Sequence, residues 1–216
     1  MAVLTWDETG EHFYETGVDH MVLYLLDNNG AYSSGVAWNG VTSVQEAPSG
    51  ADETKLYADN IKYLSLRAAE EYGSTIEAYQ YPDEWALCDG STEVATGVYI
   101  GQQGRQTFGL SYRTLLGNDV KGNDYAYKLH LVYGATASPS SRQYETVNDS
   151  PSAITMSWEI STVPIAVKDH KPTSHIEIDS SKADATKLKT LEDMLWGTSN
   201  TEASLPLPAA VISTMS

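Results

Sequence analysis

Cysteine is almost absent from this chain, which contains only Cys88. A single thiol cannot form a disulfide within the chain, so the sequence does not imply an oxidising compartment. Cys88 has no histidine near it in the sequence and lies in a segment with helical character. These surroundings favour a buried structural thiol over a nucleophile.

Basic residues are also scarce: 13 Lys and Arg stand against 29 Asp and Glu, which gives a formal net charge of −16. A protein that binds nucleic acid needs Lys and Arg to neutralise phosphates, so the sequence disfavours a nucleic-acid-binding protein. An acidic surface is compatible with DNA that passes without being retained, because like charges suppress adsorption. Solubility alone is the simpler explanation of the same charge.

Long apolar runs are missing as well. No stretch of about 18 apolar residues occurs, and the N-terminal sequence has early acidic residues without an apolar run of signal-peptide length. We therefore expect a soluble protein that makes no membrane contact and is not processed by the Sec pathway.

The chain is rich in two aromatic residue types, with 14 Tyr and 5 Trp against 2 Phe. Tyr and Trp combine apolar area with a polar edge, which suits half-buried strands and interfaces. At 216 residues and 41% hydrophobic content the chain can bury a substantial core. Because it shows no internal repeat or linker, we predict a single domain over residues 1–216.

The period of the apolar residues predicts a mainly β protein. Val18 to Leu26 is dense in strand formers, and a tight turn at 27–30 leads into a returning arm at 31–44. A second hairpin joins 106–116 to 125–137 through a polar loop at 117–124, and alternation in its second arm makes one face strongly apolar. Strands at 61–68 and 74–81 are predicted to pair around a turn at 69–73. Strands at 142–147 and 152–162 are predicted to pair around a turn at 148–151. Two shorter strands are predicted at 165–168 and 174–178.

Helical signals are few. Pro82 begins a predicted short helix that stops at Asp89-Gly90. The one substantial helix begins after a Ser181 cap, stops at Gly197 and carries an apolar stripe. The stripe consists of Leu188, Leu191, Met194 and Leu195. The expected domain also has an N-terminal arm over about 1–17. At its other end, the helix and the extended tail that follows it cover about 181–216.

The segment from Gln45 to Thr54 contains no large apolar residue. It follows a β-like stretch, Gly35 to Val44, and apolar residues return only at Leu56-Tyr57. This pattern predicts a long, exposed connection on a β scaffold. Such connections are uncommon in compact domains and are usually either functional or disordered.

Catalytic and metal-binding patterns are weak. His175, Glu177 and Asp179 would share one strand face, and the hypothesis that they bind a metal for hydrolysis competes with a plain polar face opposite inward-pointing Ile176 and Ile178. The adjacent acids at 70–71, 83–84 and 192–193 do not indicate a carboxylate pair across a cleft. The glycine-rich segment 101–105 lacks the Lys-Ser/Thr of a phosphate loop. We therefore predict no enzyme, and no catalytic, cofactor-binding or metal-binding residues.

Several long segments resemble the major tail proteins, or tail tube proteins, of long-tailed bacteriophages, of the kind found in phages and prophages of Gram-positive bacteria. The similarity lies in TGVDHMVLYLL (16–26), GVAWNGVTSVQEAPSGADETKLYADNIKYL (35–64), EAYQYPDEWALCDG (77–90), GQQGRQTFGLSYRT (101–114), LHLVYGATASP (129–139) and the ending at 191–208. The segments occur in order over nearly the whole chain.

This resemblance implies a β-sandwich or small β-barrel with a flanking C-terminal helix, which is assembled in the host cytoplasm and located in the tail of the virion. Hexameric rings would stack into a tube whose lumen holds the tape-measure protein and then passes DNA. Tail-tip or baseplate proteins and a tail terminator would be further partners. A long loop would reach the adjacent ring, and its matching residues here are Gln45, Glu46, Pro48, Gly50, Asp52, Glu53, Thr54 and Tyr57.

A carbohydrate-binding β-sandwich is the alternative from a different functional class. Trp38, Trp85 and Trp158, together with many Asp and Asn residues, motivate it.

Overall fold

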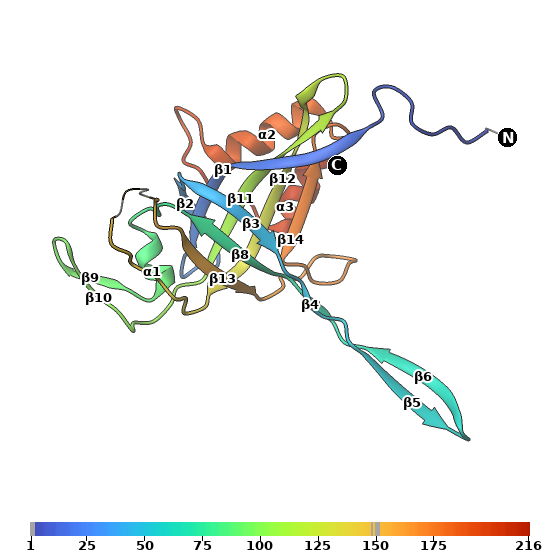
Figure 1. Cartoon of the computed structure of the whole chain (residues 1–216), viewed down its shortest axis with the longest axis horizontal. Helices are drawn as coiled ribbons and strands as arrows, with labels where there is room; N and C mark the ends of the chain where they lie inside the picture. Colours follow the sequence, from blue (N-terminus) through green and yellow to red (C-terminus); the bar gives the residue numbers. More distant parts are fainter. Residues whose placement is uncertain (1–2, 148, 150–151) are drawn as a thin grey trace.

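The computed structural model of the chain describes residues 3–147, 149 and 152–216. Its centre is an eight-stranded antiparallel sheet in the order β2-β1-β11-β12-β13-β8-β3, and β14 pairs with β12 beside this path (Figure 1). The strands are β1 (Phe13–Leu26), β2 (Tyr32–Ala37), β3 (Val41–Glu46), β8 (Gly73–Ala78), β11 (Phe108–Asn118), β12 (Gly122–Ala137), β13 (Met156–Thr162) and β14 (His175–Asp179). The predicted mainly β fold with a C-terminal helix is confirmed.

The long strand β12 changes partner along its length. Its middle residues, at 128–132, pair with β14, whereas its last residues, at 135–137, pair with β13. Gly134 lies between the two ladders with a φ of 60°, a left-handed conformation that glycine adopts without steric cost. The sheet therefore forks at Gly134.

One face of the sheet encloses a core rich in tryptophan. Trp38, Trp85 and Trp158 pack with ring centroids 4.5–5.6 Å apart, and each is at most 3% exposed. Trp85 is the first residue of α1 (Trp85–Asp89), and Cys88 of the same helix is fully buried beside it. The prediction of a buried structural Cys88 is confirmed, and burial raises the pKa of its thiol to about 12.

The other face of the sheet carries a second core under two helices, α2 (Ala185–Trp196) and α3 (Pro208–Met215). Leu129, Leu131 and Tyr133 of β12 lie in it, as their predicted alternation required. The opposite face of β12 is buried too, because Val132 belongs to the tryptophan core. The expectation of a single apolar face was therefore incomplete.

Two predicted strand pairings are correct. The tight turn at 27–30 joins β1 to β2, and the Asp27 carboxylate accepts hydrogen bonds from the backbone N–H groups of Asn29 and Ala31. β11 and β12 form the second hairpin, although both strands extend into the predicted polar loop at 117–124. The predicted returning arm at 31–44 divides into β2 and β3 at Gly40, whose φ is 78°.

Other strand predictions were wrong. The stretch at 61–68 does not pair with 74–81, because β8 pairs with β3 and β13 instead. Residues 142–147 form no strand, and β13 pairs with β12 and β8. The turn predicted at 148–151 lies, except for residue 149, outside the described residues. Ile165 makes only an isolated bridge with Thr173.

The helical predictions need three corrections. α1 begins at Trp85 and not at Pro82, although it ends as expected before Gly90. Asp184, not Ser181, caps α2: its carboxylate accepts hydrogen bonds from the backbone N–H groups of two residues in the first turn. The predicted extended tail ends in α3, which has Pro208 in its first turn.

At the N-terminus, β1 starts at Phe13, so the predicted arm over about 1–17 is too long. A short hairpin of β9 (Thr92–Ala95) and β10 (Val98–Ile100), which the sequence patterns did not indicate, lies apart from the main sheet.

Candidate functional site

A ribbon of two antiparallel chain segments projects from the sheet between β3 and β8 (Figure 1). We call residues 47–72 the projecting arm. It contains a stem, β4 (Ser49–Gly50) paired with β7 (Glu70–Glu71), and a distal hairpin, β5 (Glu53–Ala58) paired with β6 (Ile61–Arg67). Backbone hydrogen bonds from Ala47 to Gly73 and from Ala51 to Ala69 join the arm to the sheet and the stem to the hairpin.

Left-handed backbone positions shape this arm at two points. In the stem, Gly50 has a φ of 80°, and a Cβ there would lie 2.5 Å from the Ala69 carbonyl oxygen. At the tip, Asp59 and Asn60 have φ values of 51° and 62°. Positive φ at both central residues is typical of the type I′ turn, whose twist suits a two-residue hairpin.

Every residue of β5 and β6 is exposed, including large apolar ones. Leu56 and Leu64 are direct cross-strand partners, and Leu66 lies opposite Thr54 on the same face. The other face is more polar: beside the exposed Tyr57 ring, the Glu53 carboxylate accepts hydrogen bonds from Lys62 and Ser65. The distal hairpin therefore presents one apolar face that nothing in the described part of the subunit covers.

The predicted long connection from Gln45 to Thr54 is largely exposed, as expected, but most of it is built of short strands. Gln45 and Glu46 belong to β3, Gly50 to the stem, and Glu53, Thr54 and Tyr57 to β5, while Pro48 and Asp52 connect these strands. The sequence did contain a signal for the hairpin. Asp59-Asn60 between two apolar-containing segments is a turn pair that tolerates positive φ.

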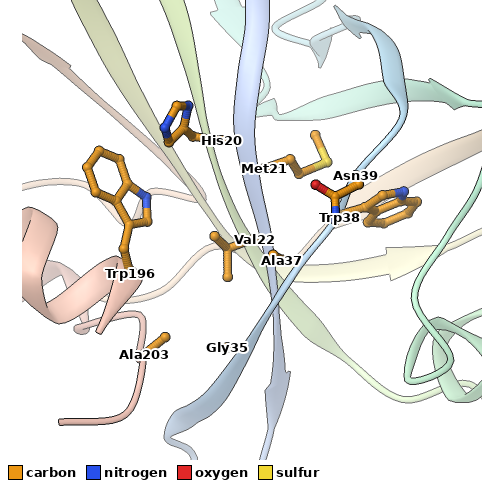
Figure 2. A pocket seen from close by; sticks show the side chains of 9 residues that line it. All are labelled: His20, Met21, Val22, Gly35, Ala37, Trp38, Asn39, Trp196 and Ala203. Carbon is orange, nitrogen blue, oxygen red and sulfur yellow. The ribbon is translucent and has the colours of Figure 1, made fainter. Parts of the chain in front are cut away.

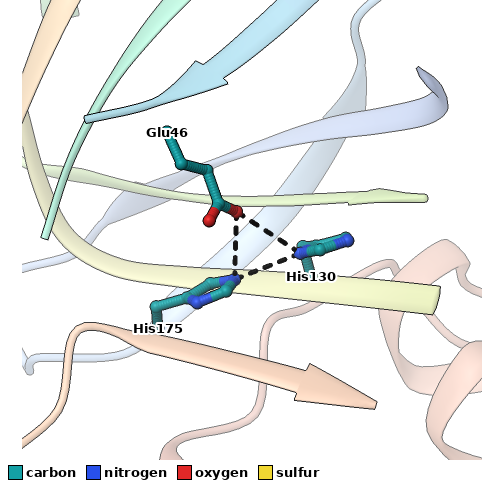
Figure 3. Close-up of side chains that lie close together, drawn as sticks. All are labelled: Glu46, His130 and His175. Atoms are coloured by element: carbon teal, nitrogen blue, oxygen red, sulfur yellow. Dashed lines mark hydrogen bonds and ion pairs between the residues drawn. The ribbon is translucent and has the colours of Figure 1, made fainter. Parts of the chain in front are cut away.

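A polar cluster lies where the arm leaves the sheet. Glu46 ends β3, His130 lies in β12 and His175 begins β14 (Figure 3). The Nδ1 atom of His130 is 3.2 Å from the Nε2 atom of His175, and these nitrogens lie 3.6 and 3.7 Å from the Oε1 atom of Glu46. The three side chains come from strands that are distant in sequence, so only the tertiary fold brings them together.

Aromatic rings hold the two imidazoles. The Tyr112 ring stacks on His130 with centroids 4.6 Å apart, and the Tyr72 ring stacks on His175 at 4.7 Å. The Tyr112 hydroxyl donates a hydrogen bond of 2.8 Å to Glu46 Oε1. Burial lowers the pKa of both histidines and raises the pKa of Tyr72 to about 12. The imidazoles are therefore biased towards their neutral, ligand-competent form.

The metal hypothesis for His175, Glu177 and Asp179 fails on geometry. Glu177 pairs with Lys128 at 3.1 Å, and the Asp179 carboxylate accepts hydrogen bonds from the backbone and side chain of Ser181. Their strand instead faces the second core, since Ile178 is buried and Ile176 packs against that core. Only His175 of the three joins a cluster with ligand geometry, because residues on one strand diverge along it.

A separate hollow of about 470 Å³ lies between β1, β2 and the end of α2 (Figure 2). It is lined by His20, Met21, Val22, Gly35, Ala37, Trp38, Asn39, Trp196 and Ala203. The His20 and Trp196 rings contact each other on one side of it, with ring centroids 5.3 Å apart. Its lining is mainly apolar and brings no acid–base pair together.

The carbohydrate alternative loses its basis in this structure. The three tryptophans that motivated it are 0–3% exposed and pack against one another, so no sugar can stack on their rings. The Nε1 of Trp38 also donates a hydrogen bond to the Gln80 carbonyl oxygen. These residues are structural.

Comparisons with known proteins give distant structural matches. No family model matches the chain, and no curated protein matches it significantly. The chain is similar to a chain of the 6-fold symmetrised baseplate of the anti-feeding prophage, with 9% identity, a TM-score of 0.36, and 81% of this chain and 97% of that chain covered. It is also similar to a chain of the sheath-tube complex of the extracellular contractile injection system PVC in its extended state, with 12% identity, a TM-score of 0.32, and 74% of this chain and 88% of that chain covered. A third similar chain belongs to the PVC sheath/tube terminator in its extended state, with 12% identity, a TM-score of 0.30, and 82% of this chain and 99% of that chain covered.

Among the described residues, no helix is both long and apolar enough to cross a membrane.

Proposed function

We propose that this protein is a structural subunit of a phage tail tube, in which hexameric rings stack and the projecting arm of each subunit binds the adjacent ring. The observation that carries the proposal is the arm with its uncovered apolar face. The order and length of the sequence segments that resemble tail tube proteins support it independently.

The energetics of the arm favour an intermolecular role. A two-stranded hairpin alone is marginally stable in water, and this one exposes Leu56, Leu64 and Leu66 by 42, 36 and 55%. Exposed apolar patches on soluble proteins commonly mark binding surfaces. Full burial of an exposed leucine contributes about 1.5–3 kcal/mol, and each of these half-exposed leucines would contribute roughly 0.5–1.5 kcal/mol, so a neighbouring subunit that covers this face would bind it favourably.

Two further features fit a subunit of a ring that surrounds DNA. β3 pairs on one side only in the described sheet, which leaves a strand edge that a neighbour can extend. The net charge of −16 would let DNA pass without specific binding. In this role the tape-measure protein, tail-tip or baseplate proteins and a tail terminator would be partners, and the mature location would be the virion.

Electron microscopy of purified protein, alone and with tail-tip components, tests this function. We expect rings or tubes from the native chain. Replacing Leu56 and Leu64 together with Asn is expected to raise the concentration needed for tube formation by about 10-fold or more, because the remaining apolar burial of these two half-exposed leucines, roughly 0.5–1.5 kcal/mol each, is lost. Circular dichroism should show an unchanged β domain.

The matched control replaces Lys55 and Ser65, the cross-strand pair on the opposite face, with Asn. This variant should assemble like the native chain. A third variant, in which Asn-Gly replaces residues 52–68, removes the distal hairpin and keeps the stem. Tubes of normal length from that variant would show that the arm is not the contact between rings.

A further inference from the structure

We propose that Glu46, His130 and His175 bind one divalent transition-metal ion of the zinc type at the root of the projecting arm. This site is independent of the proposed tail function. The three side chains are the only group of His, Cys, Asp and Glu residues with metal-ligand spacing among the residues that the structure describes.

The spacing of the three ligand atoms matches a single ion. Their separations are 3.2, 3.6 and 3.7 Å. A circle through three points so spaced has a radius of about 2.0 Å, and zinc lies about 2.0–2.2 Å from histidine nitrogen and carboxylate oxygen. An ion could therefore reach all three atoms at bonding distance without rearrangement of the strands. Figure 3 shows the two ring nitrogens facing each other beneath the carboxylate.

Hydrogen bonds around His130 leave its Nδ1 free to act as a ligand. The Thr114 hydroxyl donates its proton to Glu15 at 2.5 Å, so its oxygen can only accept from the His130 Nε2 atom, 3.0 Å away. A neutral imidazole that is protonated at Nε2 carries its lone pair on Nδ1. This contact is the kind of outer partner that fixes the tautomer of metal-binding histidines.

A hydrogen bond also positions the carboxylate of Glu46. The Tyr112 hydroxyl donates a hydrogen bond to Oε1, which holds this oxygen beside the two histidine nitrogens. Two imidazoles and one carboxylate form the ligand set that suits Zn²⁺, whereas Ca²⁺ and Mg²⁺ prefer oxygen alone. Glu46 is 41% exposed, so solvent can reach the ion and a water can complete a tetrahedral shell.

The consequence of binding is mechanical. β3 does not pair with β12 or β14, yet the ion would join all three strands. Because Glu46 is the last residue before the arm, the ion would fix the arm root against the sheet. We expect slower amide hydrogen exchange in the stem, β4 and β7, when the ion is bound.

Isothermal titration of Zn²⁺ into the full chain, free of affinity tags and stripped by a chelator, tests the site. We expect one ion per chain, and visible d–d absorption when Co²⁺ is used instead. Glu46→Gln and His175→Asn should each weaken binding by at least about 10–100-fold, the range known for loss of even an outer partner. Both positions are more exposed than His130, so the variants should fold, which circular dichroism verifies.

His12→Asn is the matched control, because His12 also lies near two carboxylates, Asp7 and Asp119, but outside the cluster. It should leave Zn²⁺ affinity unchanged. Absence of stoichiometric binding, or binding that survives both cluster variants, would overturn the proposal. In that case the three side chains form a hydrogen-bonded cluster only, in which His175 Nε2–H donates to His130 Nδ1.

Discussion

Replacing Leu131 with aspartate is expected to leave the protein unfolded at 25 °C. Leu131 is 0% exposed at the centre of β12, between β11 and β14, in the core that α2 and α3 cover. Truncation of a buried leucine alone costs about 2–5 kcal/mol, and burial of an unpaired carboxylate adds several more. Together these terms are comparable with the whole stability of a domain, about 5–15 kcal/mol.

Circular dichroism and urea unfolding measure this effect. The same substitution at Leu66, which is 55% exposed on the projecting arm, is the control and should keep the cooperative unfolding of the native domain. A folded, monomeric Leu131→Asp variant that had lost only assembly would contradict the assignment of β12 to the interior.

Gly134→Ala is expected to destabilise the domain by about 3 kcal/mol or more, through strain at a left-handed position and a backbone collision. A Cβ at Gly134 would lie 2.2 Å from the Val163 carbonyl oxygen. The neighbouring strand cannot simply move away, because the Val163 N–H donates a 2.9 Å hydrogen bond to the Gly134 carbonyl oxygen and the Gly134 N–H donates one to the Tyr32 hydroxyl.

Gly122→Ala separates the two causes. Gly122 lies in the same strand with a φ of 59°, but its Cβ would meet nothing within 4 Å. The free energy of unfolding of this variant should fall only by the cost of a left-handed alanine, about 1–2 kcal/mol. Urea unfolding curves measure both losses, because a shift of the midpoint at an unchanged m-value gives the change in the free energy of unfolding. Equal losses for the two variants would show that the fork of the sheet does not need the close approach at Gly134.

The projecting arm and the polar cluster meet at Glu46. The arm needs an external surface to cover Leu56 and Leu64, and its direction depends on how firmly its root is held. The stem consists of only two paired residues on each side, so the Glu46 contacts are an important constraint on that direction. Ion binding and assembly are separately measurable, and each can fail without the other.

Local patterns in the sequence were sufficient for the features that depend on neighbouring residues. Asp27 to Gly30 specified the first hairpin turn, the alternation around Leu131 specified the core face of β12, and Leu188 with Leu191 specified the buried stripe of α2. Composition determined the acidic charge, and the helical surroundings of Cys88, without a nearby histidine, predicted its buried role. These properties follow from residue type and spacing, so the mainly β fold class could be predicted.

Only the tertiary structure decided which strands pair and which side chains meet. The alternation at 61–67 predicts a strand, but it does not contain the identity of the partner, and β6 pairs with β5 in the arm. Likewise, Glu46, His130 and His175 have no sequence spacing that indicates a site. Their convergence depends on the fork of β12 and the path of β3, because pairing between distant segments is set by the summed packing of the whole core and not by any local period.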